Sequence, residues 1–306
     1  MKERAKVCLV LGGGGARGLA HLGVLQVLER EDIPVDYVVG TSVGAVVGAC
    51  YCLNPDALNE TRRALAYFNS DEFRGSAFKK VFLKSEDVER NFLSSLITSV
   101  KKSYVFSNLL RKQAIFPGEK LFEVISDLVP KKEFGEAKIP FAVPALDIQR
   151  GDEILITEGE LQPAVYASCS LPGFFPPVEH QGRLLADAGV IGPVPVSAAR
   201  QHFEPDVVIA VDITSSLNAT DELGSGLDVI LRVESIAGTR LNDLELEKAD
   251  VVIRPDVGTK YWSDFSDLEV LITEGVLATE PLIGDIREAI HKRGSKSFWK
   301  AIAGAR

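Results

Sequence analysis

The chain has 306 residues, of which 46% are hydrophobic and 25% charged, and its formal net charge is −9. This balance is typical of a globular protein with a sizeable core and excludes a disordered chain. The acidic excess argues against nucleic acid as a partner, because phosphate contacts need a basic face. No apolar run reaches the roughly 18 residues that span a bilayer, so membrane contact would be peripheral.

Short apolar runs alternate with longer helical patterns, which predicts βα units around a mainly parallel sheet. The expected strands are residues 6–11, 35–39, 139–147, 153–157, 183–187, 207–212 and 251–256. We expect one α/β domain: a catalytic part at 6–212 with a helical insertion at about 55–130, and sheet completion and helices at 213–306. Helix starts are expected at Asn54-Pro55, Ser85-Glu86 and Pro117-Gly118.

The first strand runs directly into a glycine loop, Gly12 to Gly15 followed by Ala16, Arg17 and Gly18, and then into a helix. Exposed N–H groups and the positive end of a helix favour a negative group, either a bound phosphate or a transient oxyanion. The loop also fits the G-x-G-x-x-G dinucleotide fingerprint, so a nucleotide-binding, Rossmann-like oxidoreductase is the alternative. That fingerprint needs an acidic residue at the end of the second strand, where this chain has Thr41 and Ser42.

The second strand ends in Gly40-Thr41-Ser42-Val43-Gly44, and a helix of small residues follows. This is the G-x-S-x-G pattern in a strand-to-helix setting, which predicts a strained turn that exposes the serine hydroxyl. A nucleophile and an array of N–H donors at the ends of two strands favour acyl transfer over phosphate binding.

A serine nucleophile needs a base, and histidine is the usual partner. No histidine follows a strand end; they lie in or near helices or in a hairpin turn, at His21, His180, His202 and His291. Asp187 ends a strand-like run just before Ala188 and Gly189, and is the best-placed candidate. Asp147 and Asp212 also end such runs, but structural roles suit them better.

These three motifs, in this order, resemble the patatin-like phospholipase family. The resemblance spans residues 7–211, including the segment 167–178, and implies a three-layer sandwich with a mainly parallel central sheet flanked by helices. It also implies a Ser42–Asp187 dyad without histidine. The oxyanion would be held by N–H groups of the glycine loop, in which Gly14 and Gly15 are central and Gly13 and Arg17 take part.

One motif departs from the family pattern, because Ala188 stands where the family usually has glycine. The added methyl group would restrict the backbone if that position required a positive φ. The resemblance implies an ester of a phospholipid, a lysophospholipid or an acylglycerol as the substrate. We expect no metal site, because the carboxylates and histidines do not cluster at ligand spacing, and no cofactor is needed. A catalytically silent lipid-binding member is a further alternative. Phe174 and Phe175 either line an acyl pocket or pack beneath its rim.

Residues 73–112 carry nine Lys or Arg against three acidic residues, together with several aromatic residues. This composition fits either a peripheral contact with an anionic bilayer or a solvated helical face. The short apolar run after Lys6 does not resemble a signal peptide and predicts a cytoplasmic protein, with the inner face of the membrane as its site of contact. The oligomeric state is left open. No cysteine pair has the C-x-x-C spacing, so we expect buried free thiols at Cys8, Cys50, Cys52 and Cys169.

Overall fold

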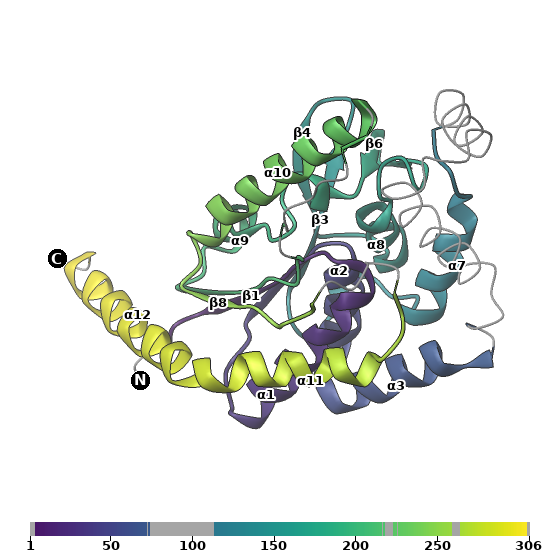
Figure 1. Ribbon diagram of the computed structural model, residues 1–306. Coiled ribbons are helices and arrows are strands. Elements are labelled where there is room, and N and C mark those ends of the chain that lie inside the picture. Colours follow the sequence, from purple (N-terminus) through teal and green to yellow (C-terminus); the bar gives the residue numbers. More distant parts are fainter. Residues whose placement is uncertain are drawn as a thin grey trace.

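The computed structural model describes residues 4–71, 73, 113–215, 217, 223–224, 226–258 and 264–304 (Figure 1). Its centre is a sheet with the strand order β5-β6-β3-β2-β1-β7-β8, and β4 pairs with β3. The strands are β1 (Val7–Leu11), β2 (Tyr37–Gly40), β3 (Phe141–Asp147), β4 (Asp152–Ile156), β5 (Val178–His180), β6 (Arg183–Ala186), β7 (Val207–Val211) and β8 (Val251–Ile253). Strands β3, β2, β1, β7 and β8 run parallel, whereas β4 and β6 are antiparallel to β3. The expected mainly parallel α/β sheet is confirmed.

All seven expected strands are present, most of them shorter than expected at one or both ends. The sequence prediction missed β5, which pairs with β6 across a tight turn at Gln181 and Gly182, both with positive φ. The hairpin reading of His180 is therefore correct. Three residues are too few to show the alternation by which a strand is recognised.

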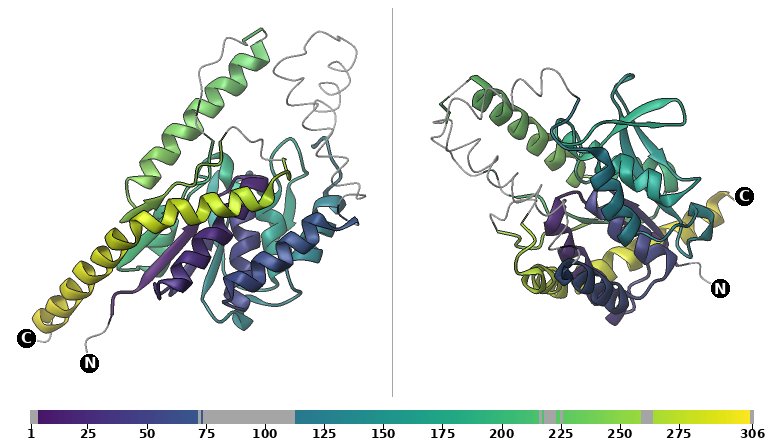
Figure 2. Two further views of the ribbon diagram at one scale, coloured as in Figure 1. Left: turned by 60° about the horizontal axis from the view of Figure 1, so that its bottom comes forward. Right: turned by 90° about the vertical axis from the view of Figure 1, so that its right-hand side faces the viewer.

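Helices cover both faces of the sheet, which gives the three layers (Figures 1 and 2). The α-helices are α1 (Ala20–Arg30), α2 (Val43–Leu53), α3 (Ala57–Asn69), α7 (Gly118–Leu128), α8 (Leu161–Cys169), α9 (Val196–Phe203), α10 (Gly226–Leu246), α11 (Leu268–Thr279) and α12 (Ile283–Gly304). The 3-10 helices are η1 (Gly15–Leu19), η2 (Phe134–Glu136), η3 (Ala188–Val190) and η4 (Glu280–Leu282). Among the described residues, no helix combines the length and the hydropathy needed to cross a membrane.

Two of the three expected helix starts can be compared with the structure. Helix α7 begins at Gly118 after Pro117, as expected. Helix α3 begins at Ala57, two residues after Pro55, because the Asp56 carboxylate caps it by accepting a hydrogen bond from the Asn59 N–H at 2.9 Å. The start expected at Ser85-Glu86 lies outside the described residues.

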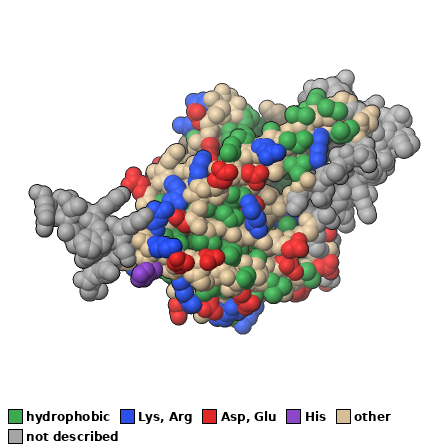
Figure 3. Space-filling model, turned by 60° about the vertical axis from the view of Figure 1, so that its left-hand side comes forward, with side chains coloured by type: hydrophobic (Ala, Val, Ile, Leu, Met, Phe, Trp, Pro, Cys, Tyr) green, Lys and Arg blue, Asp and Glu red, His purple; other side chains and the backbone are tan. Residues whose placement is uncertain are grey.

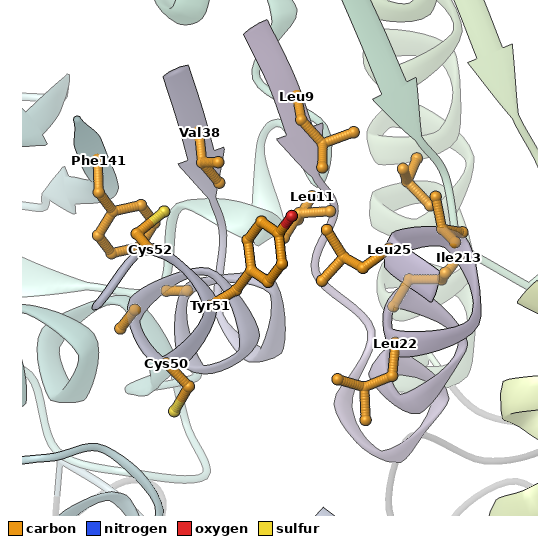
Figure 4. Close-up of a cluster of buried hydrophobic side chains, with 14 of the residues drawn as sticks. Leu9, Leu11, Leu22, Leu25, Val38, Cys50, Tyr51, Cys52, Phe141 and Ile213 are labelled. Atoms are coloured by element: carbon orange, nitrogen blue, oxygen red, sulfur yellow. The ribbon is translucent and has the colours of Figure 1, made fainter. Parts of the chain in front are cut away.

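The alternating faces of β1 divide the core into two layers. Leu9 and Leu11 point toward α1 and α2, where they meet Leu22, Leu25 and other apolar side chains (Figure 4). Cys8 and Val10 face the opposite layer. Every residue of β1 and of β7 is buried, which is typical of a parallel strand covered on both sides and explains why these runs are uninterrupted in the sequence.

The strand order places the carboxyl ends of β2, β1 and β7 next to one another, with β1 in the middle. Leu11 pairs with Gly40 of β2 on one side and with Val211 of β7 on the other. The chain therefore leaves these three strands at the same level, and the loops that follow them meet. In open α/β sheets this is the edge at which ligands bind.

Candidate active site

Ser42 occupies the sharp turn between β2 and α2. It is the N-cap residue of α2, with φ 53° and ψ −119°, a conformation that side-chain-bearing residues rarely adopt. Glycine is required on both sides of the turn. A Cβ at position 40 would overlap the Gly44 carbonyl oxygen, and one at position 44 would overlap the carbonyl oxygen of Leu11. The G-x-S-x-G pattern thus forms a strained turn, as its sequence setting suggested.

The glycine loop lies directly beside this turn. The N–H groups of Gly12 and Gly13 donate to the carbonyl oxygens of Val211 and Pro193, each at 3.0 Å. In the described part of the chain, the N–H groups of Gly14 and Gly15 have no acceptor. These two donors are therefore available to an oxyanion, whereas Gly13 provides room beside Ser42.

Arg17 sets the direction of one of these donors. Its Nε donates to the Gly14 carbonyl oxygen at 2.9 Å. In a trans peptide the C=O and the following N–H point in opposite directions, so this bond turns the Gly15 N–H away from Arg17. Gly15 adopts φ 60°, a conformation that glycine adopts at little cost.

Asp187 follows β6 and is almost fully buried. Burial raises the pKa of its carboxyl group to about 6, although the hydrogen bond from the Gly189 N–H and the nearby Ser42 hydroxyl favour the ionised form. The Gly189 bond is 2.7 Å long. Ala188 does not have a positive φ, so the methyl group that departs from the family pattern is accommodated in η3. Asp187 and Ser42 therefore lie close together, and the carboxyl group of Asp187 can hold a proton near neutral pH.

Strand geometry explains how Asp187 reaches Ser42. Strand β6 runs antiparallel to β3, with Ala186 opposite Leu146, so Asp187 lies one step back along β3. Strand β2 pairs with the beginning of β3 and stops at the corresponding level. Asp187 therefore follows an antiparallel strand, whereas the sequence interpretation treated all strand ends alike.

The end of α8 holds both members of the pair, and sequence reasoning did not assign it this role. The Ser168 hydroxyl accepts a hydrogen bond from the Ser42 backbone N–H at 3.0 Å, and the Ser170 carbonyl accepts one from the Asp187 backbone N–H at 3.0 Å. Between them in the chain, Cys169 lines the same cavity as Ser42. Burial and the charge of Asp187 raise the pKa of the Cys169 thiol, so it stays protonated and does not compete as a nucleophile. The signal in the sequence was the segment 167–178, which resembles the family, although its residues were not assigned a supporting role.

The histidines lie away from this pair. His21 is fully buried, and its Nε2 lies 2.8 Å from the Gly12 carbonyl oxygen, which makes Nε2–H the donor. Burial lowers its pKa to about 4, so the ring is neutral and supports the base of the glycine loop. His180 is in the β5–β6 hairpin, and His202 packs against Phe203 at the end of α9.

Asp147 and Asp212 are tied into ion pairs. Hydrogen bonds from Arg150 and Arg183, at 2.8 and 3.0 Å, lower the pKa of Asp147 to about 2. Asp212 accepts hydrogen bonds from Thr214 and lies 3.3 Å from Arg254. Within the described ranges, no group of three or more metal-ligating side chains could hold a metal ion.

A cavity of about 560 Å³ opens from the pair into the helical layer. Ser42, Asp187 and the glycine loop line one end, and most of the remaining wall is apolar. Leu171 and Phe175 contribute to this wall, so the aromatic segment before β5 does reach the cavity. Its size falls in the range of small-molecule sites, and its apolar lining suits a hydrocarbon chain.

The far end of the cavity lies between α2, α3 and α7. Residues on one face of α2 line the cavity in sequence from Ser42 onward: Val43, Val46, Val47 and Cys50. At that end Glu60 and Arg63 form an ion pair at 2.6 Å, and the Cys50 thiol donates to the Leu128 carbonyl oxygen at 3.3 Å. The polar groups of Glu60, Arg63 and Cys50 at this end of the cavity therefore all have hydrogen-bond or ion-pair partners within the protein.

Cys8, Cys50 and Cys52 are buried and Cys169 is partly buried, and all four are free thiols. This agrees with the expectation from their spacing, and two of the four, Cys50 and Cys169, also line the cavity. The segment 73–112 cannot be compared with its two interpretations, because apart from Phe73 it lies outside the described residues. Phe73 itself is buried and packs on the rings of Tyr67, Phe68 and Phe265.

A parallel α/β sheet with a serine at a strand-to-helix turn beside a glycine loop defines a class of acyl-transfer fold. The chain matches the family model described as patatin-like phospholipase over residues 9–200. It therefore belongs to the patatin-like phospholipase family, as its three motifs suggested.

Relatives are found in animals and bacteria. The chain is 32% identical over 247 residues to a patatin-like phospholipase domain-containing protein of Caenorhabditis elegans, covering 78% of this chain and 16% of that protein. It is 30% identical over 211 residues to an uncharacterized NTE family protein of Mycobacterium tuberculosis, covering 69% of this chain and 50% of that protein. The chain thus spans half or less of the length of these relatives.

A solved structure, that of VipD from Legionella pneumophila, has a similar fold. It aligns with 92% of this chain and 67% of its own chain with a TM-score of 0.50, at 13% sequence identity. At this identity the similarity supports the fold alone.

Proposed function

We propose that the protein is a serine-dependent lipid acyl hydrolase that cleaves carboxylic esters through an acyl-enzyme on Ser42. The observation that carries this proposal is that Ser42 and the buried Asp187 line the same apolar cavity beside the glycine loop, in a chain of the patatin-like phospholipase family. Phospholipids, lysophospholipids and acylglycerols are the substrate classes that this site suits.

The first half of the reaction forms the acyl-enzyme. Asp187 accepts the proton of the Ser42 hydroxyl while Oγ attacks the ester carbonyl carbon. The negative charge that develops on the carbonyl oxygen is held by the N–H groups of Gly14 and Gly15. When the tetrahedral intermediate collapses, the ester C–O bond breaks and Asp187 returns the proton to the departing alcohol oxygen.

The second half repeats these steps with water. Asp187 takes a proton from a water molecule while the water oxygen attacks the acyl carbon. Asp187 then returns that proton to Ser42 Oγ as the fatty acid leaves. A carboxylate with the usual pKa near 3.9 is a weak base, and burial brings that of Asp187 closer to the working pH.

A fluorophosphonate probe is expected to label Ser42, because the phosphonyl oxygen can occupy the oxyanion position while Oγ attacks phosphorus. Peptide mapping by mass spectrometry locates the label. Ser42→Ala is the control and should remain unlabelled. Labelling at Ser168 or Ser170, or equal labelling of the variant, would contradict the assignment. A labelled protein that hydrolyses no lipid ester would be the silent, lipid-binding alternative.

The apolar cavity is proposed to hold the acyl chain. Cys50 lies eight residues beyond Ser42 on the same helix, or about 12 Å along its axis. Cys50→Leu adds volume at this far end, and kcat/KM for a palmitoyl ester is expected to fall about 10- to 200-fold, the usual effect of small volume changes in an apolar pocket. For a butyryl ester, which ends before Cys50, kcat/KM should change little.

Cys52→Leu is the matched control, because Cys52 is on the same helix and does not line the cavity. This control should have the same chain-length preference and the same rate of butyryl hydrolysis as the wild type. The stability of the control is expected to decrease through overpacking. If Cys50→Leu left the ratio of palmitoyl to butyryl hydrolysis unchanged, the chain would lie elsewhere.

A further inference from the structure

Helix α10 carries its large apolar side chains on the outside of the molecule. Six of them are between 43% and 64% exposed: Val229, Ile230, Val233, Ile236, Leu241 and Leu244. At about 100° per residue, these positions fall within an arc of about 140° and so lie along one side of the helix. We call these six residues the α10 apolar face. In Figure 3 hydrophobic side chains gather along the upper right of the molecule, where α10 runs.

The opposite side of α10 attaches the helix to the body through polar and small residues, and through Leu246, which is buried in the core at the end of the helix. Gly238 lies against the backbone of Val190, where a Cβ would come within 3.6 Å of the carbonyl oxygen. The Glu245 carboxylate accepts hydrogen bonds from the N–H and the hydroxyl of Ser197 at 2.7 and 2.8 Å. Asn242 is buried on this same side. These contacts set the rotation of the helix and leave the apolar face outside.

The helix begins at the edge of the sheet that carries the active site. Strands β7 and β8 are parallel, so the chain between them must return along α10 from the carboxyl edge. Thr214, three residues beyond the end of β7, lines the active-site cavity. Ile191, four residues after Asp187, is 39% exposed. One end of α10 rises beyond the rest of the described chain (Figure 2, left).

We propose that the α10 apolar face docks on a lipid bilayer and so brings the mouth of the cavity to its substrate. Apolar burial would drive this docking, because α10 carries four acidic residues against two arginines. A helix with this charge gains nothing from an anionic surface, which attracts basic segments. An electrically neutral, zwitterionic bilayer is therefore the surface that fits, with the helix lying in the interfacial plane.

A second copy of the chain fits this face less well. A stable protein interface buries about 800 Å² on each partner and involves roughly 20–30 residues a side. The α10 apolar face has six side chains on one projecting helix, whereas a single amphipathic helix is sufficient for interfacial binding to lipid. The docking proposal rests on the lipid hydrolase function proposed above, because the bilayer is taken as the source of the ester.

Co-sedimentation of the full chain with phosphatidylcholine vesicles tests the proposal. The double variant Ile230→Gln/Val233→Gln removes two exposed apolar side chains without changing charge. Val270→Gln/Leu277→Gln is the matched control, since these side chains are 51% and 54% exposed on α11. Wild type and control are expected to sediment with the vesicles, and the partition coefficient of the α10 variant is expected to fall at least tenfold. The sites are solvent-exposed, so all three proteins should melt alike.

Two further measurements separate the possible outcomes. Hydrolysis of a soluble butyryl ester should be the same in all three proteins, while hydrolysis of vesicle lipid should fall with binding. If wild type does not sediment, or the α10 variant sediments equally, the proposal is wrong. It is also overturned if wild type is a dimer by sedimentation velocity that the α10 variant converts to a monomer. If the wild type hydrolyses no soluble ester but binds vesicles more strongly than the α10 variant does, the docking proposal is supported and the proposed hydrolase function is wrong.

Discussion

Replacement of Asp187 by asparagine is expected to lower kcat for a soluble ester by about 10²- to 10⁴-fold, the usual contribution of a general base. Asparagine keeps the shape of the side chain and can still accept the Gly189 N–H bond, but it cannot take the proton from Ser42. Steady-state kinetics checks this result. His202→Ala is the control and should leave kcat nearly unchanged, because His202 lies at the end of α9.

The same variant is expected to be more stable than the wild type at neutral pH. Burial raises the pKa of Asp187 from the usual 3.8 to about 6, so the ionised form is less favourable in the folded than in the unfolded protein. The resulting penalty appears as pH rises from about 4 to 6, persists above that range, and corresponds to roughly 3 kcal/mol at most. The melting temperature of Asp187→Asn should therefore exceed that of wild type at pH 8, with the difference vanishing below about pH 4.

The pH–rate profile gives an independent measurement. Because Asp187 acts as a base only when ionised, kcat/KM of the wild type is expected to decrease as pH falls through about 6. If His202→Ala lowered kcat as much as Asp187→Asn at an unchanged melting temperature, a histidine would have to belong to the site, and the dyad would be wrong.

The substitution Gly275→Val is expected to lower the free energy of unfolding by about 3 kcal/mol, which is the upper end of the usual cost of overpacking. Helix α11 crosses α1 at two glycines. A Cβ on Gly275 would overlap the Ala20 carbonyl oxygen, and one on Gly23 would overlap that of Ile272. The backbone of one helix meets that of the other, so no side-chain rotation can relieve the overlap. Because α1 directly follows the glycine loop, activity should fall as well.

Denaturant unfolding measures this difference. Gly284→Val is the matched control, because a Cβ at Gly284, in the first turn of α12, would have no atom within 4 Å. This control should cost less than about 1 kcal/mol, the range of helix propensities. Equal losses for the two variants would show that helix propensity, and not the crossing of α1 and α11, sets the effect.

The sequence alone was sufficient for the central strands and for two of the motifs at their ends. Strands β1 and β7 are buried on both faces, so their residues form continuous apolar runs. The glycine loop and the Gly40–Gly44 turn are local, because each is determined by the backbone conformation of a few consecutive residues. Asp187 could be chosen as the candidate base because it ends a strand and is followed by small residues. The raised pKa of its carboxyl group could not be predicted from the sequence.

What the tertiary structure decided depends on distant segments. The raised pKa of Asp187 comes from burial by the surrounding elements. The backbone N–H of Ser42 is held by Ser168, which lies more than 100 residues away in the chain, and that of Asp187 is held by Ser170. Strand β5 and the antiparallel approach of Asp187 depend on pairing partners that no local pattern reveals. Gly23 and Gly275 look like weak points of two helices, and only their contact explains them. Local patterns record the conformation of a segment, whereas burial, proton affinity and helix crossing are properties of the neighbours that folding brings to it.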